Sequence, residues 1–359
     1  MRSEKVAEYR AKAHKRALWI FVFIAIVAVI AVYSLSVDKF GISMDDVIAF
    51  LSNHISGNIP EKSADYMAWM TDKRIMDSTV PRTIGGIGVG ATLAICGAMM
   101  QSITRNPLTD PYTIGISSAA LFGVAISISY GICIIPIVNG DSDASMIINA
   151  FVFAMVPALA IIFVSTFKKM SPTMMILVGI GLMYMFSAFT TFIKYNSEAE
   201  DLHEIYEWSI GTLSRMDLAD SYPILIGFIL ILIFGMVVAN KINVMTAGDN
   251  MSKSLGVNPI RLRVICFMVM SVATAICVCF TGSIGFVGLV APHIARLFVG
   301  SDNKILIPTA AVVGALLVLV SDVAVRLLPG ALPVGTITAL IGSPLFIYIL
   351  YRQRKNAAF

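Results

Sequence analysis

Apolar and polar stretches alternate along the whole chain at a spacing typical of repeated membrane crossings. Each apolar run has about 20 residues, the length that a helix needs to cross roughly 30 Å of hydrocarbon, apart from one shorter run. The ten runs lie at 17–37, 83–104, 113–138, 146–167, 173–195, 222–240, 260–281, 284–299, 305–328 and 333–351. The pattern predicts an all-α polytopic membrane protein with ten transmembrane helices, forming a single permease-like domain over 1–359.

Composition supports a chain that lives in the lipid bilayer. Hydrophobic residues make up 57% of the chain and charged residues 13%, whereas about 25% of the residues of an ordinary soluble domain are charged. The first apolar run is too long for a signal peptide and no small-residue cleavage site follows it, so we expect it to remain as a span. The five cysteines all lie in or beside apolar runs, a pattern that indicates neither a disulfide framework nor a zinc site.

Basic residues are distributed unevenly between the two sides of the predicted bundle. When successive loops are assigned to alternate sides, 18 of the 26 Lys and Arg residues fall on the side of both termini and eight on the other. Loops rich in Lys and Arg stay in the cytoplasm, so we expect both termini to be cytoplasmic in the cell membrane. The segment 38–82 is then extracytoplasmic, and the basic arm at 1–16 either meets anionic lipid or simply ends the first span.

A polar interval at 241–263, KINVMTAGDNMSKSLGVNPIRLR, separates two apolar runs on the cytoplasmic side. Connections inside compact domains usually have only a handful of residues, so a loop of this length indicates a function. Thr246 or Asp249 can cap a first helical turn, Gly256 can end it, and Pro259 can open the next helix. We predict two short helices that form a docking surface.

Sequence patterns for catalysis are scarce. The stretch from Gly248 to Ser254 differs from a phosphate-binding loop, because Ser252 stands where that motif requires glycine and the spacing is one residue short. The four histidines are scattered without ligand spacing. His293, beside a helix end, is more typical of a packing or hydrogen-bonding residue than of a proton relay. We therefore expect no catalytic residue, no ATP site, no cofactor and no resident metal.

Small residues mark two places where helices can pack closely. Gly86, Gly90 and Ala94 are spaced four apart, which gives one helix face on which another helix can approach. Because these residues lie within a predicted span, we expect the partner to be another span.

A second glycine-rich region precedes a short apolar run. Gly282, Gly285 and Gly288 come before Pro292 and His293, which predicts a short, interrupted helix. Irregular backbone at membrane depth is tolerated only where protein or a water-filled cavity covers it. These five residues are candidates for a transport pathway or gate, although close packing alone would also explain the glycines.

One acidic residue, Asp322, lies inside a predicted span. Arg326 is four residues further on and shares its helix face, so we predict a structural ion pair near the extracytoplasmic end, where water can reach it. This pair is expected to hold Arg326 toward the outer face. Arg82 and Arg326 both sit at outer span ends and are candidates for docking a binding protein; snorkelling of long side chains is the alternative.

Four stretches resemble the permease subunits of the iron-complex and cobalamin ABC importers, the FecCD-type family. The resemblance covers about residues 80–351 and includes RNPL followed by DP at 105–111 and FVGLVAPHIAR at 286–296. Two positions depart from the family pattern. Thr79 replaces the first arginine of an Arg-x-Pro-Arg motif, and Ala331 stands where an acidic residue often precedes Pro-Val-Gly, so contact with the binding protein is expected to differ.

The resemblance implies a type II ABC importer permease with ten spans. Such a permease pairs with a second permease subunit, identical or related, receives substrate from an extracytoplasmic binding protein, and is driven by two cytoplasmic ABC ATPase subunits. The family's ATPase dock matches the loop 241–263. The residues that this places at the dock, with supporting residues on the same side, are Thr246, Gly248, Asp249, Leu255, Gly256, Arg105, Asn106, Pro107 and Arg296.

Two other classes of function are the alternatives to an ABC importer permease, and three substrates are considered within the permease interpretation. An ion-coupled secondary transporter would need more intramembrane acids than Asp322, and an intramembrane enzyme would need a paired catalytic set that the spans lack. Nothing indicates nucleic-acid binding. Within the family a ferric siderophore is the favoured substrate, with haem or a corrinoid such as cobalamin as alternatives.

Overall fold

The chain is all-helical in the part that the structure describes. The computed structural model describes residues 2–38, 41–136, 138–139, 142–167, 171–330 and 332–357, so Ala331 lies outside the described residues, as do the side chains of the basic arm up to residue 15. In chain order the helices are α1 Arg2–Ser36, α2 Met44–Ser56, α3 Tyr66–Arg74, the π-helical η1 Ile75–Thr79, α4 Val80–Thr104, the 3₁₀ turn η2 Pro111–Ile114, α5 Ile116–Tyr130, α6 Asp143–Phe167, α7 Pro172–Asn196, α8 Ala199–Ile210, α9 Leu218–Thr246, α10 Asp249–Ser254, α11 Pro259–Thr281, α12 Val287–Val299, α13 Asn303–Leu327 and α14 Val334–Ala357.

Each of the ten predicted apolar runs overlaps one of these helices. Seven helical stretches are long and apolar enough to cross a membrane, while the runs at 113–138, 284–299 and 333–351 correspond to shorter apolar helices. The polytopic all-α prediction is confirmed. Ten complete crossings stay a prediction.

Much of the segment 38–82 is helical. It contains α2 and α3, and α3 continues through η1 into α4, so that one helical stretch runs over Tyr66–Thr104. The helix therefore begins well before the predicted apolar run at 83–104. The backbone widens at η1, where the Val80 N–H donates to the Ile75 carbonyl, just before Pro81, which has no N–H to continue the ordinary ladder.

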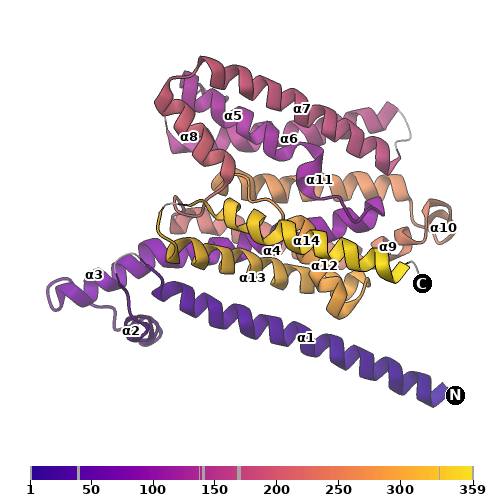
Figure 1. Ribbon diagram of the computed structural model, residues 1–359, viewed down its shortest axis with the longest axis horizontal. Helices are drawn as coiled ribbons and strands as arrows, with labels where there is room; N and C mark the ends of the chain where they lie inside the picture. Colours follow the sequence, from indigo (N-terminus) through magenta and orange to yellow (C-terminus); the bar gives the residue numbers. More distant parts are fainter. Residues whose placement is uncertain are drawn as a thin grey trace.

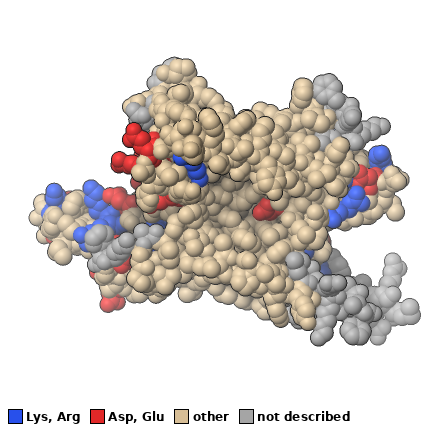
Figure 2. Space-filling view, turned by 45° about the horizontal axis from the view of Figure 1, so that its top comes forward, with Lys and Arg blue, Asp and Glu red and all other residues tan. Residues whose placement is uncertain are grey.

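The long helices lie roughly along one direction and give the molecule two distinct ends (Figure 1). The start of α1, the helix α10 and the end of α14 lie at one end, which we call the α10 end; α2, α3 and α8 lie at the other, which we call the α8 end. In Figure 2 the charged side chains gather mainly at two opposite ends, and most of the surface between them is uncharged. This distribution is the one expected of a protein that spans a bilayer.

Helix α4 forms the centre of the bundle and packs against α9, α11, α12 and α13. A Cβ atom on Gly90 would lie 2.3 Å from the Gly314 carbonyl oxygen of α13, and one on Gly314 would meet Gly90 and Ala94. No side chain fits in so narrow a space, so the two backbones touch. The predicted small-residue face is confirmed, and α13 is its partner.

Candidate functional site

The interval 241–263 contains one short helix, because the neighbouring long helices extend into it. Helix α9 continues to Thr246, α11 begins at Pro259 behind an Asn258 cap, and α10 lies between them as a single short helix. Gly256 has the left-handed backbone conformation, with φ +79°, just beyond the end of α10. The predicted roles of Gly256 and Pro259 are confirmed, while the prediction of two short helices in the loop was wrong.

The predicted caps of α10 were also wrong. The residue at the N-cap position is Gly248, which has no side chain to accept a hydrogen bond, and Thr246 donates its hydroxyl to the Asn243 carbonyl within α9. Asp249 is the first residue of α10, and its carboxylate points to other helices. The reason is that Arg105 and Arg263 both bind this carboxylate and hold it away from the start of α10.

Asp249 joins α10 to two long helices. The Arg263 guanidinium of α11 donates through Nη1 to Asp249 Oδ2 at 2.8 Å and through Nη2 to Oδ1, and Arg105 Nη2, at the end of α4, donates to Oδ1 at 3.1 Å. The hydrogen bonds from Arg263 lower the pKa of Asp249 below its usual range. The carboxylate therefore stays ionised and fixes the position of α10.

Arg263 was not predicted as a functional residue from the sequence. Its side chain is buried, and besides Asp249 it reaches the Ile103 carbonyl, to which Nε donates at 3.2 Å. The available signal was a charged residue inside the first apolar turns of a span, where a buried cation normally has a partner.

The outward side of α10 carries apolar side chains. Met251 in α10 is 54% exposed, and Leu255, directly after the end of α10, is 61% exposed. We call Met251, Leu255 and the adjoining Gly256 the α10 tip. An exposed apolar tip on a rigidly anchored helix is a suitable contact for a partner protein.

The loop after α4 lies next to α10. Arg105 has φ +54° as it leaves the helix, and the Asn106 side chain accepts a hydrogen bond from the Leu108 N–H, which forms a tight turn around Pro107. The structure thus brings Arg105 to Asp249 but leaves the Asn106 side chain in its own turn.

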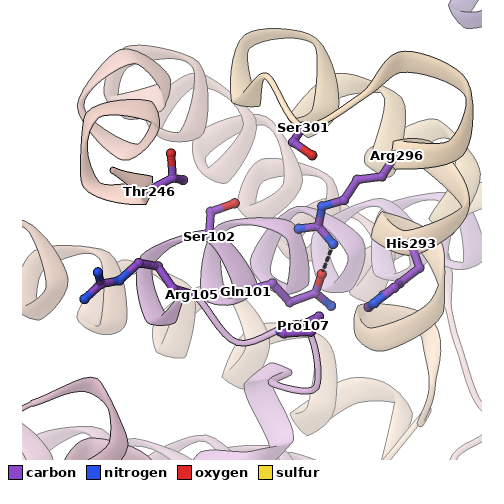
Figure 3. Close-up of a pocket in the computed structure, with 8 residues that line it drawn as sticks. All are labelled: Gln101, Ser102, Arg105, Pro107, Thr246, His293, Arg296 and Ser301. Atoms are coloured by element: carbon purple, nitrogen blue, oxygen red, sulfur yellow. Dashed lines mark hydrogen bonds between the residues drawn. The ribbon is translucent and has the colours of Figure 1, made fainter. Parts of the chain in front are cut away.

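Several predicted residues line one pocket of about 310 Å³ at the α10 end (Figure 3). Arg296 donates through Nη1 to Gln101 Oε1, and the Gln101 amide lies within hydrogen-bond reach of two carbonyls of α12. The lining residues are Gln101, Ser102, Arg105, Pro107, Thr246, His293, Arg296 and Ser301. The structure therefore joins His293, predicted as a pathway residue, to residues predicted for ATPase coupling.

The glycine-rich entry to α12 is irregular and covered by protein. Gly282 has φ +68° at the end of α11, and a Cβ there would lie 2.1 Å from the Trp208 carbonyl oxygen. Gly285 has open space around it, whereas Gly288 packs on α4, where a Cβ on Gly97 would meet the Gly288 oxygen at 1.8 Å. Pro292 is buried within α12. Close packing thus accounts for Gly282 and Gly288, and Gly285 stays a candidate for the pathway.

The predicted contact between Asp322 and Arg326 is present, with 2.7 Å between Asp322 Oδ2 and Arg326 Nη2. A second arginine completes it, because Arg82 Nε at the start of α4 lies 2.6 Å from Asp322 Oδ1. The Asp322 side chain is 0% exposed, so the expectation that water reaches it was wrong. Two cations rather than water compensate its charge.

Arg326 points toward α1 and not outward. Its guanidinium donates to the carbonyls of Ser34 and Val37, each at 2.7 Å, and to the Ser34 hydroxyl, and its side chain is 7% exposed. These bonds argue against the expectation that Arg326 meets a binding protein directly. Arg82, bound to Asp322, is similarly withdrawn.

Comparison with known proteins gives these features a context. The model of the FecCD transport family matches residues 23–352. A cobalamin import system permease protein of Halobacterium salinarum is 37% identical, over 78% of this chain and 73% of its own length. An iron(3+)-hydroxamate import system permease protein of Bacillus subtilis is 31% identical, over 79% of this chain and 72% of its own.

A solved structure extends the likeness to three dimensions. An inward-facing conformation of a metal-chelate type ABC transporter superposes with a TM-score of 0.79 at 28% identity, covering 93% of this chain and 98% of the other. The family match spans nearly all of the apolar helices, and the fold agrees with it. The chain belongs to the FecCD transport family of ABC importer permeases.

Proposed function

We propose that this chain takes a ferric-siderophore-type iron complex from an extracytoplasmic binding protein and passes it to the cytoplasm, driven by two separate ATPase subunits. The observation that carries the coupling part is the Asp249 cluster. It anchors α10 to α4 through Arg105 and to α11 through Arg263. A displacement of the α10 tip would therefore be transmitted to these two long helices. A second permease subunit, identical or related, completes the importer.

The α10 end is the cytoplasmic side in this proposal. Its support is the excess of basic residues among the loops assigned to that side and the exposed apolar side chains of Met251 and Leu255. An ATPase subunit that closes on the α10 tip would transmit its movement through Asp249, because this residue is bound to both Arg105 and Arg263.

The α8 end receives the binding protein in this proposal. Arg82 and Arg326 are engaged within the protein, so docking uses the exposed charges nearby. Arg215 is one such group, and it pairs with Glu204 at 3.2 Å and with Glu207 at 2.8 Å. Exposed charges of this kind steer encounter and orientation more than they add affinity.

Substrate identity rests on the relatives. One is named for an iron(3+)-hydroxamate and one for cobalamin, and the solved neighbour is described as a metal-chelate transporter. Cobalamin, a cobalt chelate, fits two of these three descriptions as a ferric hydroxamate does; further relatives named as iron chelatin permeases favour the iron complex, and a corrinoid or haem is the alternative cargo.

Transport in proteoliposomes tests the proposal. The chain is reconstituted with its ATPase subunits and binding protein, and uptake of a ferric hydroxamate, haem and cyanocobalamin is measured with and without ATP. We expect ATP-dependent uptake of the ferric hydroxamate that a proton ionophore leaves unchanged. If only cyanocobalamin or only haem is taken up, that compound is the substrate in place of the ferric hydroxamate. Uptake that is lost when the ionophore is added would contradict coupling to ATP hydrolysis.

A further inference from the structure

The pocket beside α12 has the size of a small-molecule site. It lies between the last turns of α4, the end of α9 and α12, and its volume of about 310 Å³ is at the lower end of the range for ligand pockets. In Figure 3 the side chains of Gln101, Arg296 and His293 lie on one side of it, with the hydroxyl groups of Ser102, Thr246 and Ser301 above.

Arg296 is a cation without a matching anion. Its Nη1 donates to Gln101 Oε1, a neutral acceptor, and no carboxylate within 4 Å of its guanidinium is found among the described residues. Arg105, the other cation of the pocket, already contacts Asp249. Charged side chains withdrawn from water are normally paired, and a guanidinium presents a fork of N–H groups that matches the oxygens of a carboxylate or phosphate.

His293 adds an independent observation. Its Nδ1 lies 2.7 Å from the Leu289 carbonyl oxygen, and because a carbonyl only accepts, Nδ1 carries the hydrogen. The Nε2 atom is buried and has no hydrogen-bond partner in the described part of the chain. In the neutral ring this atom accepts a hydrogen bond, so a ligand that carries an O–H would satisfy it once the ring or its neighbours move to open Nε2 to the pocket.

We propose that this pocket binds a small oxyanion of the phosphate or carboxylate class, with Arg296 as its charge partner. Binding at this place goes beyond the transport of a chelate and does not depend on the identity of the cargo. The unpartnered Nε2 of His293 favours oxyanions that keep a hydroxyl group, such as hydrogen phosphate or a hydroxycarboxylate.

The test is calorimetric titration of the full chain in nanodiscs, in a buffer free of phosphate and carboxylate. Inorganic phosphate and citrate are the two probes. We expect saturable binding of at least one; phosphate alone assigns the phosphoryl class, and citrate alone the carboxylate class. The absence of saturable binding of either would overturn the proposal and leave a carboxylate of a partner protein as the group that fills the pocket.

One variant with one matched control locates the site. Arg296→Gln should raise the Kd about 10- to 100-fold, the effect of losing a charge-assisted pair. Arg261→Gln removes one exposed positive charge at the same end and should change the Kd less than about twofold. Equal losses in both variants would overturn the proposal, because they would indicate general charge attraction.

Ser301→Glu keeps the proposal testable if Arg296→Gln does not fold. Ser301 is exposed at the pocket, and a tethered carboxylate there should occupy Arg296. We expect titratable binding to disappear while the protein unfolds at or above the parent temperature. Undiminished binding of phosphate or citrate in folded Ser301→Glu would place the anion elsewhere and overturn the proposal.

Discussion

The two ends of α4 are held by the same arrangement of charges in two different environments. At its end, Arg105 shares the Asp249 carboxylate with Arg263; at its start, Arg82 shares the Asp322 carboxylate with Arg326. The Asp249 side chain is 34% exposed and that of Asp322 is 0% exposed. One cluster is therefore open to solvent and to partners, and the other is sealed.

The difference in burial indicates a difference in role. Water and salt screen the contact between Asp249 and Arg105, so this contact can be changed at modest cost. The Asp322 cluster has no solvent to replace a lost partner, and it also ties α1 in place through the bonds of Arg326 to Ser34 and Val37. We infer that the α8 end of α4 is fixed and that the α10 end is the adjustable one.

The largest expected effect on stability is that of Asp322→Asn. This change leaves Arg82 and Arg326 buried next to each other without a carboxylate, and breaking a buried pair in this way costs about 3–5 kcal/mol. Thermal unfolding in nanodiscs measures the loss. Removing all three charges together, with Arg82→Gln and Arg326→Gln added, should restore part of it, and an unchanged unfolding temperature in Asp322→Asn would contradict the sealed-cluster account.

Asp249→Asn should have a smaller and pH-dependent effect of about 1–3 kcal/mol, because the Asp249 carboxylate is 34% exposed while Arg263 is left buried without its anion. Arg263 lowers the pKa of Asp249 from its ordinary value of 3.8. A lowered native pKa adds stability above the unfolded value and loses it as the pH falls through the folded value. The difference in unfolding temperature between parent and variant should be constant above about pH 5 and shrink below 3.8; a difference that grows with acidification would have the wrong sign.

The smallest effect is expected for Thr246→Ala. Among the described residues the Thr246 hydroxyl bonds only to the Asn243 carbonyl within its own helix, and the side chain is exposed, so the change in stability should be within about 0.5 kcal/mol. If Thr246 capped α10, the loss would be about 1 kcal/mol. The unfolding temperature of the variant distinguishes the two.

The sequence predicted features that depend on local rules. Ten apolar runs, the helix start at Pro259, the left-handed Gly256 and the small-residue face at Gly90 all follow from properties of nearby residues. The contact between Asp322 and Arg326 was predictable for the same reason, since residues four apart share a helix face.

The contacts that the sequence did not predict join different helices. Arg82 and Asp322 are 240 positions apart, and Asp249 meets Arg263 only because a turn folds α10 back toward α11. Such pairs depend on how helices pack, and no periodicity in one sequence carries that information. The same limit explains why Arg326 was expected to face outward when it turns toward α1.

The measurement that tests the coupling account most directly compares two glycines with matched backbones. Gly256 has φ +79° and Gly57 has φ +77°, and a Cβ on either would meet no atom within 4 Å, so a substitution strains both positions alike. Only Gly256 lies at the α10 tip. Substrate-stimulated ATP hydrolysis by the reconstituted importer should be lost in Gly256→Trp and retained in Gly57→Trp, whereas equal stimulation in both variants would contradict the assignment of the α10 tip as the ATPase dock.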